Sequence, residues 1–396
     1  MTTFSATDPV VIVGAARTPM GGFQGELSDF TAAQLGAHAI GAALSRAGLG
    51  TDQVEEVIMG CVLPAGQGQA PARQAARGAG IPDGAGATTV NKMCGSGMQA
   101  AMFAHDMLRA GTNKVMVAGG MESMTNAPYL LEKARGGYRM GHGRVMDHMF
   151  LDGLEDAYDR GRLMGTFAEE CAQGYQFTRE AQDCFALASL ERARRRENLA
   201  AEIAPITVRT RKGETVIAED EQPRNARPEK IPTLKPAFRD GGTVTAANSS
   251  SISDGAAALA MMPLSEAERR GLTPLAAIRG HATHAQAPNL FTTAPVFALR
   301  KLLDKLAWKA ADVDLYEINE AFAVVTMAAM RELDLPHDKV NVHGGACALG
   351  HPIGASGARV IVTLLSALQK YDLRRGIATL CIGGGEATAL AVERLA

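Results

Sequence analysis

The sequence predicts an α/β protein built from two halves with the same order of elements, with a long segment inserted between their turn motifs. Three observations support this prediction. Short apolar runs alternate with helical stretches toward both ends of the chain, as in layered α/β domains. The order strand, glycine-rich turn, helix and strand occurs at 88–120 and again at 339–385. From about residue 121 to residue 251, the strand periodicity disappears.

The first half is expected to alternate strands and helices from Val10 onward. Its elements are, in order, a strand from residue 10, a helix at 31–49, a strand at 54–62, a helix at 71–79, a strand at 88–90, a helix after the next turn and a strand at 114–118. Pro71 stands at the first position of its helix, where its missing N–H has no cost. Gly14, Gly21 and Gly22 lack the G-x-G-x-x-G spacing that leads into a helix, which argues against a dinucleotide site.

The inserted segment contains charged and methionine-rich stretches in place of strands. A helix is expected at 179–196. Methionines such as Met124 and Met140 suit either a flexible apolar ligand or an irregular core, and the sequence does not decide between the two. The basic stretch 223–230 suits either a phosphorylated ligand or a solvated loop. We interpret the whole segment as one that covers a site.

The second half begins at Pro274, after a polar turn at 244–254 that leads into an alanine-rich strand. Its expected elements are a strand at 276–278, a helix at 295–306, a strand at 315–318 followed by a long helix, a strand at 339–342, a glycine-rich turn at 344–357, a helix to residue 370 and a strand at 376–381. The last strand runs into Gly383-Gly384-Gly385. The series repeats the order of the first half.

Composition and charge exclude several broad classes of protein. The chain has 396 residues, of which 46% are hydrophobic and 21% charged, and a net charge of −2. These values give no general attraction to nucleic acid or to anionic membranes. The six cysteines form no C-x-x-C pair, and neither a secretory leader nor a membrane-spanning run is expected. We therefore expect a cytoplasmic protein without nucleic-acid or membrane partners.

Cys94 is the residue with nucleophilic potential in the first glycine-rich turn. It follows the strand that ends at Val90 and precedes Gly95-Ser96-Gly97, where a helix begins. Main-chain N–H groups and the positive end of the helix dipole would favour a thiolate there, and the same groups could stabilise an oxyanion. A small buried cysteine is the alternative, which this turn alone does not exclude.

The second half supplies His351 and Cys381 at the corresponding turns. If an approximate twofold axis relates the halves, Cys94 faces His351, which can then act as its base. A glycine-rich turn followed by Pro352 favours a catalytic over a structural histidine. Cys381 ends a strand before Gly383-Gly384-Gly385, whose N–H groups could line an oxyanion hole. For Cys381, a buried core thiol remains the alternative.

Other site chemistries fit the sequence less well. His343, Cys347 and His351 are four residues apart, and on a helix they would suggest a metal site. The surrounding glycines and Pro352 make a helix improbable, so no metal is expected. A serine hydrolase would need a G-x-S-x-G motif, which the sequence lacks. A cysteine acyl hydrolase stays open, although it would leave the second cysteine unexplained.

Four sequence blocks together resemble the signature motifs of the thiolase family. They are 91–97 (NKMCGSG), 319–322 (NEAF), 350–354 (GHPIG) and 381–385 (CIGGG), in the family's order, and the likeness extends through 119–124 and over essentially the whole chain. The resemblance implies an α/β thiolase fold, in which two duplicated halves form a five-layer αβαβα core with an inserted loop domain. It divides the chain into an N-terminal half (1–122 and 253–274), a loop domain (123–252) and a C-terminal half (275–396). It also implies a homotetramer, arranged as a dimer of dimers, or a dimer.

The resemblance further implies a role for each site residue. Cys94 would carry the acyl group, His351 would activate it, and Cys381 would be the acid and base for the α-carbon proton. One oxyanion hole would consist of His351 and a water held by Asn319, and the second of the N–H groups of Cys94 and Gly383. The resemblance matches Ser250 to a pantetheine contact and Met164, Phe238 and Phe322 to the pocket lining. Leu163, His343 and, from the basic stretch, Arg224 are also expected to contact coenzyme A or the acyl group.

The activity implied by the resemblance is that of an acetyl-CoA C-acetyltransferase. Such an enzyme condenses two acetyl-CoA reversibly to acetoacetyl-CoA and CoA, by ping-pong kinetics through an acyl-cysteine, with coenzyme A as substrate and no permanently bound cofactor. A broader 3-ketoacyl-CoA thiolase of fatty-acid β-oxidation is the alternative. A non-catalytic acyl-CoA or lipid-binding protein is the alternative from another class.

Two positions depart from the family pattern. Short-chain members commonly carry a histidine where this chain has Leu163, which questions a short-chain preference. The family usually has asparagine where this chain has His343. Ketosynthases use a Cys-His-His set, but the block at 319–322 and Cys381 keep the thiolase pattern, so we expect His343 to support its loop.

Overall fold

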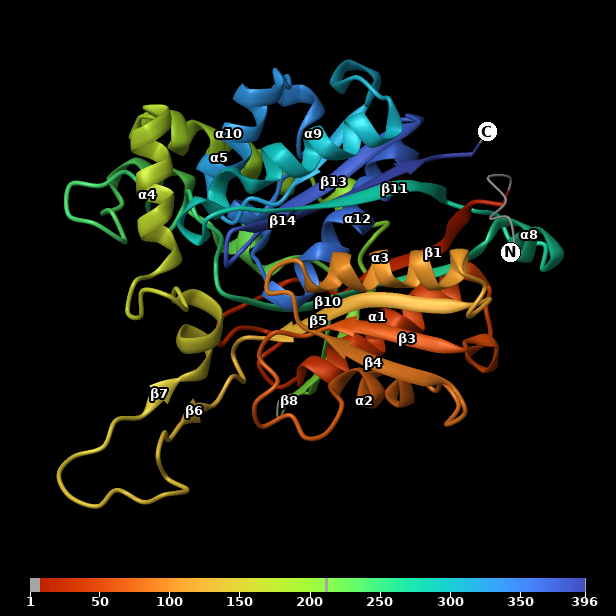
Figure 1. Ribbon diagram of the computed structural model, residues 1–396, viewed down its shortest axis with the longest axis horizontal. Coiled ribbons are helices and arrows are strands. Elements are labelled where there is room, and N and C mark those ends of the chain that lie inside the picture. The colour runs from red at the N-terminus through yellow and green to blue at the C-terminus, as the bar shows by residue number, and fades with distance from the viewer. Residues whose placement is uncertain (1–7, 211–212, 396) are drawn as a thin grey trace.

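The computed structural model describes residues 8–210 and 213–395, and it shows three helical layers alternating with two sheet layers (Figure 1). The N-terminal layers contain β1 (Val10–Arg17), β3 (Glu56–Gly60), β4 (Gly86–Val90), β5 (Met116–Ser123), β10 (Ser253–Pro263), α1 (Ala32–Ala47), α2 (Pro71–Gly78) and α3 (Ser96–Arg109). The C-terminal layers contain β11 (Ala276–Ala285), β12 (Leu315–Ile318), β13 (Arg375–Ile382), β14 (Glu386–Glu393), α9 (Ala294–Leu306), α10 (Ala323–Leu333) and α12 (Ile353–Lys370).

The hydrophobic core follows these layers. One buried cluster joins α1 and α2 to the outer face of the N-terminal strands, and another joins α9 and α10 to the C-terminal strands. A third buried cluster contains residues of both halves and fills the middle, where α3 and α12 lie between the two sheet layers (Figure 1). The five-layer αβαβα core implied by the sequence is therefore confirmed.

The strand order shows that the two halves are repeats. The N-terminal strands run in the order β4-β3-β5-β10-β1, and the C-terminal strands in the order β12-β13-β14-β11. In each half, parallel strands (β4, β3 and β5 in the first, β12 and β13 in the second) are followed by antiparallel neighbours. A single parallel bridge between Tyr316 and Val340 stands where β4 stands in the first half. The halves join edge to edge, because Val11 and Ile12 of β1 pair with β11.

Glycines bring the central helices and strands unusually close together. A Cβ atom on Gly97 of α3 would lie 2.7 Å from the main-chain nitrogen of Ala358 in α12, and one on Gly357 would lie 2.4 Å from the nitrogen of Met98. A Cβ on Gly120 of β5 would lie 2.0 Å from the carbonyl oxygen of Gly354. Only glycine permits these approaches. They place the N-terminal ends of α3 and α12, and the turns before them, side by side.

Several expected elements differ from the structure. The strand expected at 339–342 is wrong: His337–Lys339 form a 3₁₀ turn, and only Val340 bridges to a strand. β5 does not stop at its glycines but continues to Ser123, because those glycines serve helix packing. The hairpin of β8 (Ile206–Thr210) and β9 (Gly213–Ile217) and the strand β14 were not predicted from the sequence.

The inserted segment lies between the end of β5 and the start of β10. Its elements are β6 (Tyr129–Leu130), β7 (Met146–Asp147), a π-helical turn (Phe150–Leu154), α4 (Met164–Tyr175), α5 (Arg179–Ala193), α6 (Arg196–Leu199), β8, β9, α7 (Glu221–Asn225) and a 3₁₀ helix (Pro228–Thr233). A buried ion-pair cluster fixes it to β1: Arg17 donates to Glu202 at 2.5 Å and to Asp220 at 2.6 Å. The three-part division of the chain stays a prediction.

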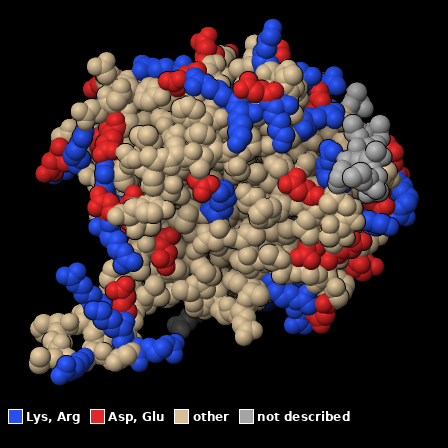
Figure 2. All heavy atoms as spheres, in the orientation of Figure 1, with Lys and Arg blue, Asp and Glu red and all other residues tan. Residues whose placement is uncertain are grey.

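The methionines of this segment do not share one environment. Met124 is buried in a small core cluster, whereas the side chain of Met140 is 93% exposed. The residues from β6 to β7 form an arm that extends from the body (Figure 1). Lysine and arginine side chains gather on this arm, at the lower left of Figure 2, while both signs of charge are mixed elsewhere on that face. Within the described part of the chain, no helix combines the length and the apolar character that crossing a bilayer requires.

Candidate active site

A cavity of about 370 Å³ lies where the two halves meet the inserted segment. It brings together residues from the ends of α3, α12, β13 and α4 and from the polar turn before β10. Its lining includes Cys94, His351, Cys381, Gly383, Leu163, Met164, Phe238, Phe322 and Ser250. Residues that are as much as 289 positions apart in the chain, such as Cys94 and Gly383 (383 − 94 = 289), therefore line one cavity.

Cys94 stands at a tight turn between β4 and α3. Met93 before it has a φ of +48°, which non-glycine residues rarely adopt, so the surrounding contacts must hold the turn. The Asn91 side chain accepts from the Met93 N–H at 2.9 Å, and the Ser96 hydroxyl accepts from the Lys92 N–H at 2.8 Å. A Cβ on Gly95 would lie 2.3 Å from the Ile382 side chain of β13. The block at 91–97 thus presents Cys94 to the cavity from a fixed turn.

The surroundings of Cys94 correct one expectation from the sequence. The N–H groups of Cys94 and Gly383 both approach the thiol and lower its pKa, as expected for an oxyanion hole. Burial has the larger effect and raises the pKa to about 11. The N–H groups of Gly95 and Ser96 are not available, because they donate to carbonyls within the turn. Cys94 therefore rests as a thiol, and the expected bias toward thiolate is wrong for the free protein.

His351 is held in the tautomer that a base requires. Its Nδ1 lies 2.6 Å from the hydroxyl oxygen of Ser356, and that hydroxyl donates its only proton to the carbonyl of Pro352 at 2.9 Å. The Ser356 oxygen must therefore accept from Nδ1–H, which leaves Nε2 unprotonated. Burial, followed by the charge of Arg359, lowers the pKa of His351 to about 3. A neutral imidazole with an unprotonated Nε2 therefore lines the same cavity as the Cys94 thiol.

Asn319 lies behind His351 and does not line the cavity. It is fully buried, and its amide nitrogen is 3.5 Å from both ring nitrogens of His351. Arg359 donates to the Asn319 oxygen at 3.1 Å, which directs the amide nitrogen toward the histidine. Arg359 is itself buried 3.6 Å from the carboxylate of Glu317. This chain of contacts fixes which end of the Asn319 amide can serve as a donor.

Cys381 and Gly383 come from the end of β13. Cys381 is 1% exposed, and burial together with the nearby Cys94 thiol raises its pKa well above the ordinary cysteine value. The turn after it depends on Gly384 and Gly385, whose φ angles are +93° and +89°. A Cβ on Gly385 would also lie 2.4 Å from the Gln286 carbonyl. The last glycine block therefore sets the direction of the Gly383 N–H toward Cys94.

Part of the cavity wall is apolar. The rings of Phe238 and Phe322 meet edge to face with centroids 5.9 Å apart. Gly165 permits this, since a Cβ there would lie 2.4 Å from the Phe238 ring. Leu163 and Met164, at the start of α4, add aliphatic surface to the same wall. The arrangement suits a small apolar group beside the two cysteines.

Two main-chain hydrogen bonds hold the polar turn before β10 at the cavity. The Ser250 N–H donates to the carbonyl of Ala321 at 2.9 Å, and the His351 N–H donates to the carbonyl of Ser251 at 3.1 Å. Ser250 is thereby held at the cavity wall, where its hydroxyl can meet a polar chain that enters the site.

Two residues predicted for ligand contact lie away from the cavity. Arg224 pairs with Glu26 at 2.6 Å and lines a separate depression beside α6. His343 is fully buried, and its ring lies 5.5 Å from the ring of Tyr371. The placement of His343 at the substrate is therefore wrong, because its loop turns the ring into the protein interior. The helix judged improbable here does form for one turn, as α11 (Ala346–Leu349).

The residues that orient the site were not predicted from the sequence. Ser356 and Arg359 lie one and nearly two helical turns into α12, and they fix His351 and Asn319 respectively. Glu122 is fully buried and accepts from the N–H groups of Val62, Leu63 and Gly354. Buried polar residues inside otherwise apolar elements were the available signal, since such groups need partners.

Comparison with known proteins agrees with the fold and the site. The family described as thiolase, N-terminal domain, matches residues 10–265, and thiolase, C-terminal domain, matches residues 272–394. The chain is 50% identical over 393 residues to acetyl-CoA acetyltransferase 2 of Arabidopsis thaliana, covering 98% of this chain and 97% of that one. It is 47% identical over 390 residues to acetyl-CoA acetyltransferase of Cupriavidus necator, covering 97% and 99%.

Solved structures give the same result. The acetyl-CoA acetyltransferase of Bacillus anthracis superimposes with a TM-score of 0.95 at 41% identity, covering 98% of this chain and 99% of that chain. A thiolase from Ascaris suum in complex with coenzyme A superimposes with a TM-score of 0.92 at 38% identity, covering 98% and 100%. This chain belongs to the thiolase family.

Proposed function

We propose that this protein is an acetyl-CoA C-acetyltransferase, which joins two acetyl-CoA reversibly to acetoacetyl-CoA and CoA. The observation that carries the proposal is the single cavity that holds Cys94, His351, Cys381 and Gly383. Relatives about 50% identical over nearly the whole chain are acetyl-CoA acetyltransferases, which supports the same reaction here. Coenzyme A is a substrate and product in this scheme.

The first half-reaction loads Cys94. Nε2 of His351 takes the thiol proton while sulfur attacks the thioester carbonyl of acetyl-CoA. The N–H groups of Cys94 and Gly383 stabilise the oxyanion of the tetrahedral intermediate, and the protonated His351 returns its proton to the departing CoA sulfur. The result is acetyl-Cys94 and free CoA. Because Cys94 and His351 both rest neutral, the proton transfer accompanies the attack instead of preceding it.

The second half-reaction forms the carbon–carbon bond. Nε2 of His351 takes the Cys381 proton, and the resulting Cys381 thiolate removes a proton from the methyl group of a second acetyl-CoA. The enolate oxygen is stabilised by the protonated His351 and by a water held by Asn319. The enolate carbon attacks acetyl-Cys94, which releases acetoacetyl-CoA and the Cys94 thiolate. The protonated His351 gives its proton to that thiolate, which restores the neutral resting state and balances atoms and charge. The reverse sequence cleaves acetoacetyl-CoA with CoA.

The cavity supports a short acyl group beside a pantetheine arm. Phe238, Phe322 and Met164 close the space next to the cysteines, and Ser250 offers a hydroxyl toward the incoming arm. Leu163 stands where short-chain members commonly have histidine, and its aliphatic side chain gives longer acyl groups no polar obstacle. A broader 3-ketoacyl-CoA thiolase is therefore the second candidate. Comparing kcat/KM for acetoacetyl-CoA and a six-carbon 3-ketoacyl-CoA separates the two.

The test of the activity is the consumption of acetoacetyl-CoA with and without free CoA. The proposal expects consumption that requires CoA and yields acetyl-CoA. Consumption without CoA, with release of free acid, would indicate a cysteine acyl hydrolase. No consumption under either condition would indicate a non-catalytic acyl-CoA or lipid-binding protein. The Cys94→Ser variant is the matched control, and it should retain the fold but lose the activity.

We infer a homotetramer, a role in fatty acid metabolism and a loop domain at 123–252 between the two halves from the family resemblance, and a cytoplasmic location from the composition of the sequence. Sedimentation of the purified protein tests the assembly directly, and a monomer at working concentration would refute it.

A further inference from the structure

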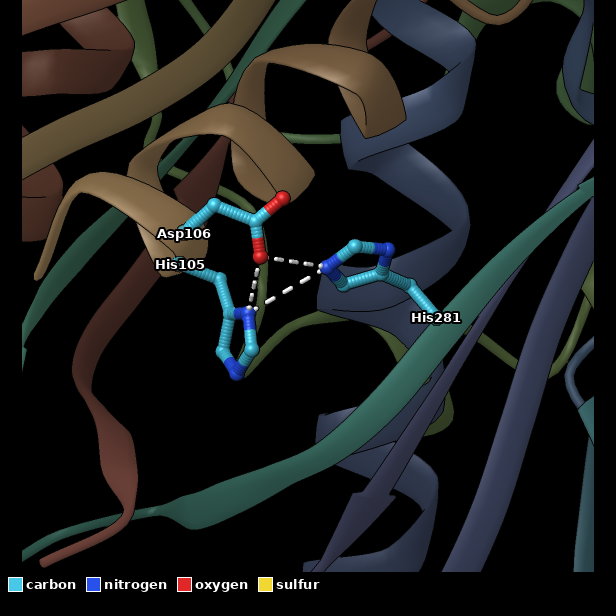
Figure 3. Close-up of side chains that lie close together, drawn as sticks. All are labelled: His105, Asp106 and His281. Carbon is cyan, nitrogen blue, oxygen red and sulfur yellow. Dashed lines mark hydrogen bonds and ion pairs between the residues drawn. The ribbon is translucent and has the colours of Figure 1, made fainter. Parts of the chain in front are cut away.

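A second group of chemically active side chains lies outside the cavity, between the two halves. His105 and Asp106 come from the last turns of α3, and His281 comes from β11. Figure 3 shows the three side chains pointing toward one another. The proposed acyl-transfer scheme uses none of them, and none lines the cavity.

The three polar atoms converge on one point. Asp106 Oδ1 lies 3.0 Å from His105 Nδ1 and 2.9 Å from His281 Nε2, and the two nitrogens are 3.2 Å apart (Figure 3). The imidazole rings are perpendicular, at 89° with centroids 5.0 Å apart, so they do not stack. Each ring instead turns one nitrogen toward the same carboxylate oxygen.

Hydrogen bonds alone satisfy this arrangement poorly. If both nitrogens donate to Asp106 Oδ1, two N–H protons point at one oxygen and lie close to each other, although a carboxylate offers other lone pairs. If one nitrogen is unprotonated, its lone pair faces the carboxylate oxygen. A cation bound by both lone pairs and by the oxygen removes either conflict.

The spacing matches that of a metal's ligands. Ligand atoms about 2.0–2.1 Å from a tetrahedral zinc ion lie about 3.4 Å from one another. The observed separations need to lengthen by only a few tenths of an ångström. Two imidazoles and one carboxylate are also an ordinary ligand set for zinc, with a water as the fourth ligand. The side chain of Asp106 is 59% exposed, so solvent reaches the site.

We propose that His105, Asp106 and His281 bind a divalent transition-metal ion such as zinc. The ion joins α3, the helix that begins just after Cys94, to the first strand of the C-terminal half. It therefore links the two halves at a distance from the cavity and stabilises their contact. The proposal does not depend on the acyltransferase activity.

Titrating the metal-free protein with ZnCl₂ by calorimetry, and with CoCl₂ by absorbance, tests the proposal. One tight site is expected, with a tetrahedral cobalt spectrum that lacks a sulfur-to-metal charge-transfer band, because no cysteine is a ligand. His281→Ala should weaken binding by more than about tenfold. His284→Ala is the matched control, because His284 lies on the same strand but bonds to Gln286, and it should bind the metal normally.

Two further variants keep the test decisive. Asp106→Asn changes an exposed side chain without changing its shape, so this variant can be used to test metal binding if His281→Ala does not fold. Cys94→Ser distinguishes this site from the thiol of the cavity. Binding that survives Cys94→Ser and is lost in Asp106→Asn supports the proposal. Loss of metal binding in Cys94→Ser overturns the proposal, and so does unchanged binding in both His281→Ala and Asp106→Asn. The absence of binding to the parent protein at about 10⁻⁴ M metal also overturns it.

Discussion

Replacing Ser356 with alanine should slow the acetylation of Cys94 while leaving the fold in place. The Ser356 hydroxyl is the acceptor that fixes the proton on Nδ1 of His351, at 2.6 Å, and Ser356 is fully buried. In the Ser356→Ala variant, the Nδ1–H loses its partner, and the opposite tautomer, with its proton on Nε2, becomes competitive. That tautomer cannot accept the Cys94 proton.

The size of the effect follows from this hydrogen bond. A buried donor left without its acceptor costs about 1–3 kcal/mol. When His351 accepts the proton it becomes a cation, and its bond to Ser356 strengthens, so the loss is felt more in the transition state than in the resting protein. At about 1.4 kcal/mol for each tenfold change, the rate should fall between about fivefold and about 150-fold.

A rapid-quench assay with acetyl-CoA, read by intact-protein mass spectrometry, measures the acetylation rate directly. Thr363→Val is the control: Thr363 lies on the same helix, is also fully buried, and its hydroxyl donates to Glu202 instead of to the site. It should lower thermal stability but preserve the acetylation rate. A Ser356→Ala protein that is folded and acetylates within twofold of the parent rate would refute the assigned tautomer.

Three other predictions follow from the buried groups around the site. Arg359→Gln should reduce condensation by about tenfold or more, and acyl exchange much less, because Asn319 loses its orientation; equal losses in both assays would contradict this. Because the pKa of Cys94 is raised to about 11, alkylation by iodoacetamide should accelerate about tenfold per pH unit from pH 7 to pH 10, and a plateau near pH 7 would show a thiolate instead. Burial raises the pKa of Glu317 from 4.5 to about 8, so its contribution to stability is present below about pH 4.5 and is lost as the pH rises to about 8. The Tm gain of Glu317→Gln over the parent should therefore be larger at pH 8.5 than at pH 5.5, and an equal difference would contradict the shift.

The main elements and the duplication could be predicted because they depend on local patterns. The apolar run from Val10 gives β1, and Thr31 and Gly48 mark the ends of α1 through its caps. The same order of strand, turn and helix in both halves predicted that Cys94 and His351 share a site, and both line one cavity. Spacing along the chain was sufficient for these features.

The failures have physical causes that spacing does not contain. Thiol ionisation at Cys94 depends on burial, which outweighs the N–H groups that the turn supplies. The direction of the His343 ring depends on how its loop packs against Tyr371. The group of His105, Asp106 and His281 joins residues 175 positions apart, so no local motif announces it.

The central claim, that Cys94 carries the acyl group and Cys381 moves the α-carbon proton, is tested most directly in Cys381→Ala. Incubating this variant with acetyl-CoA should give one added acetyl group, mapped to Cys94 by peptide mass spectrometry, while acetoacetyl-CoA formation falls to background. The parent should show both, and Cys94→Ser neither. Acetylation mapped to another residue such as Cys347, or condensation at the parent rate in Cys381→Ala, would contradict the account.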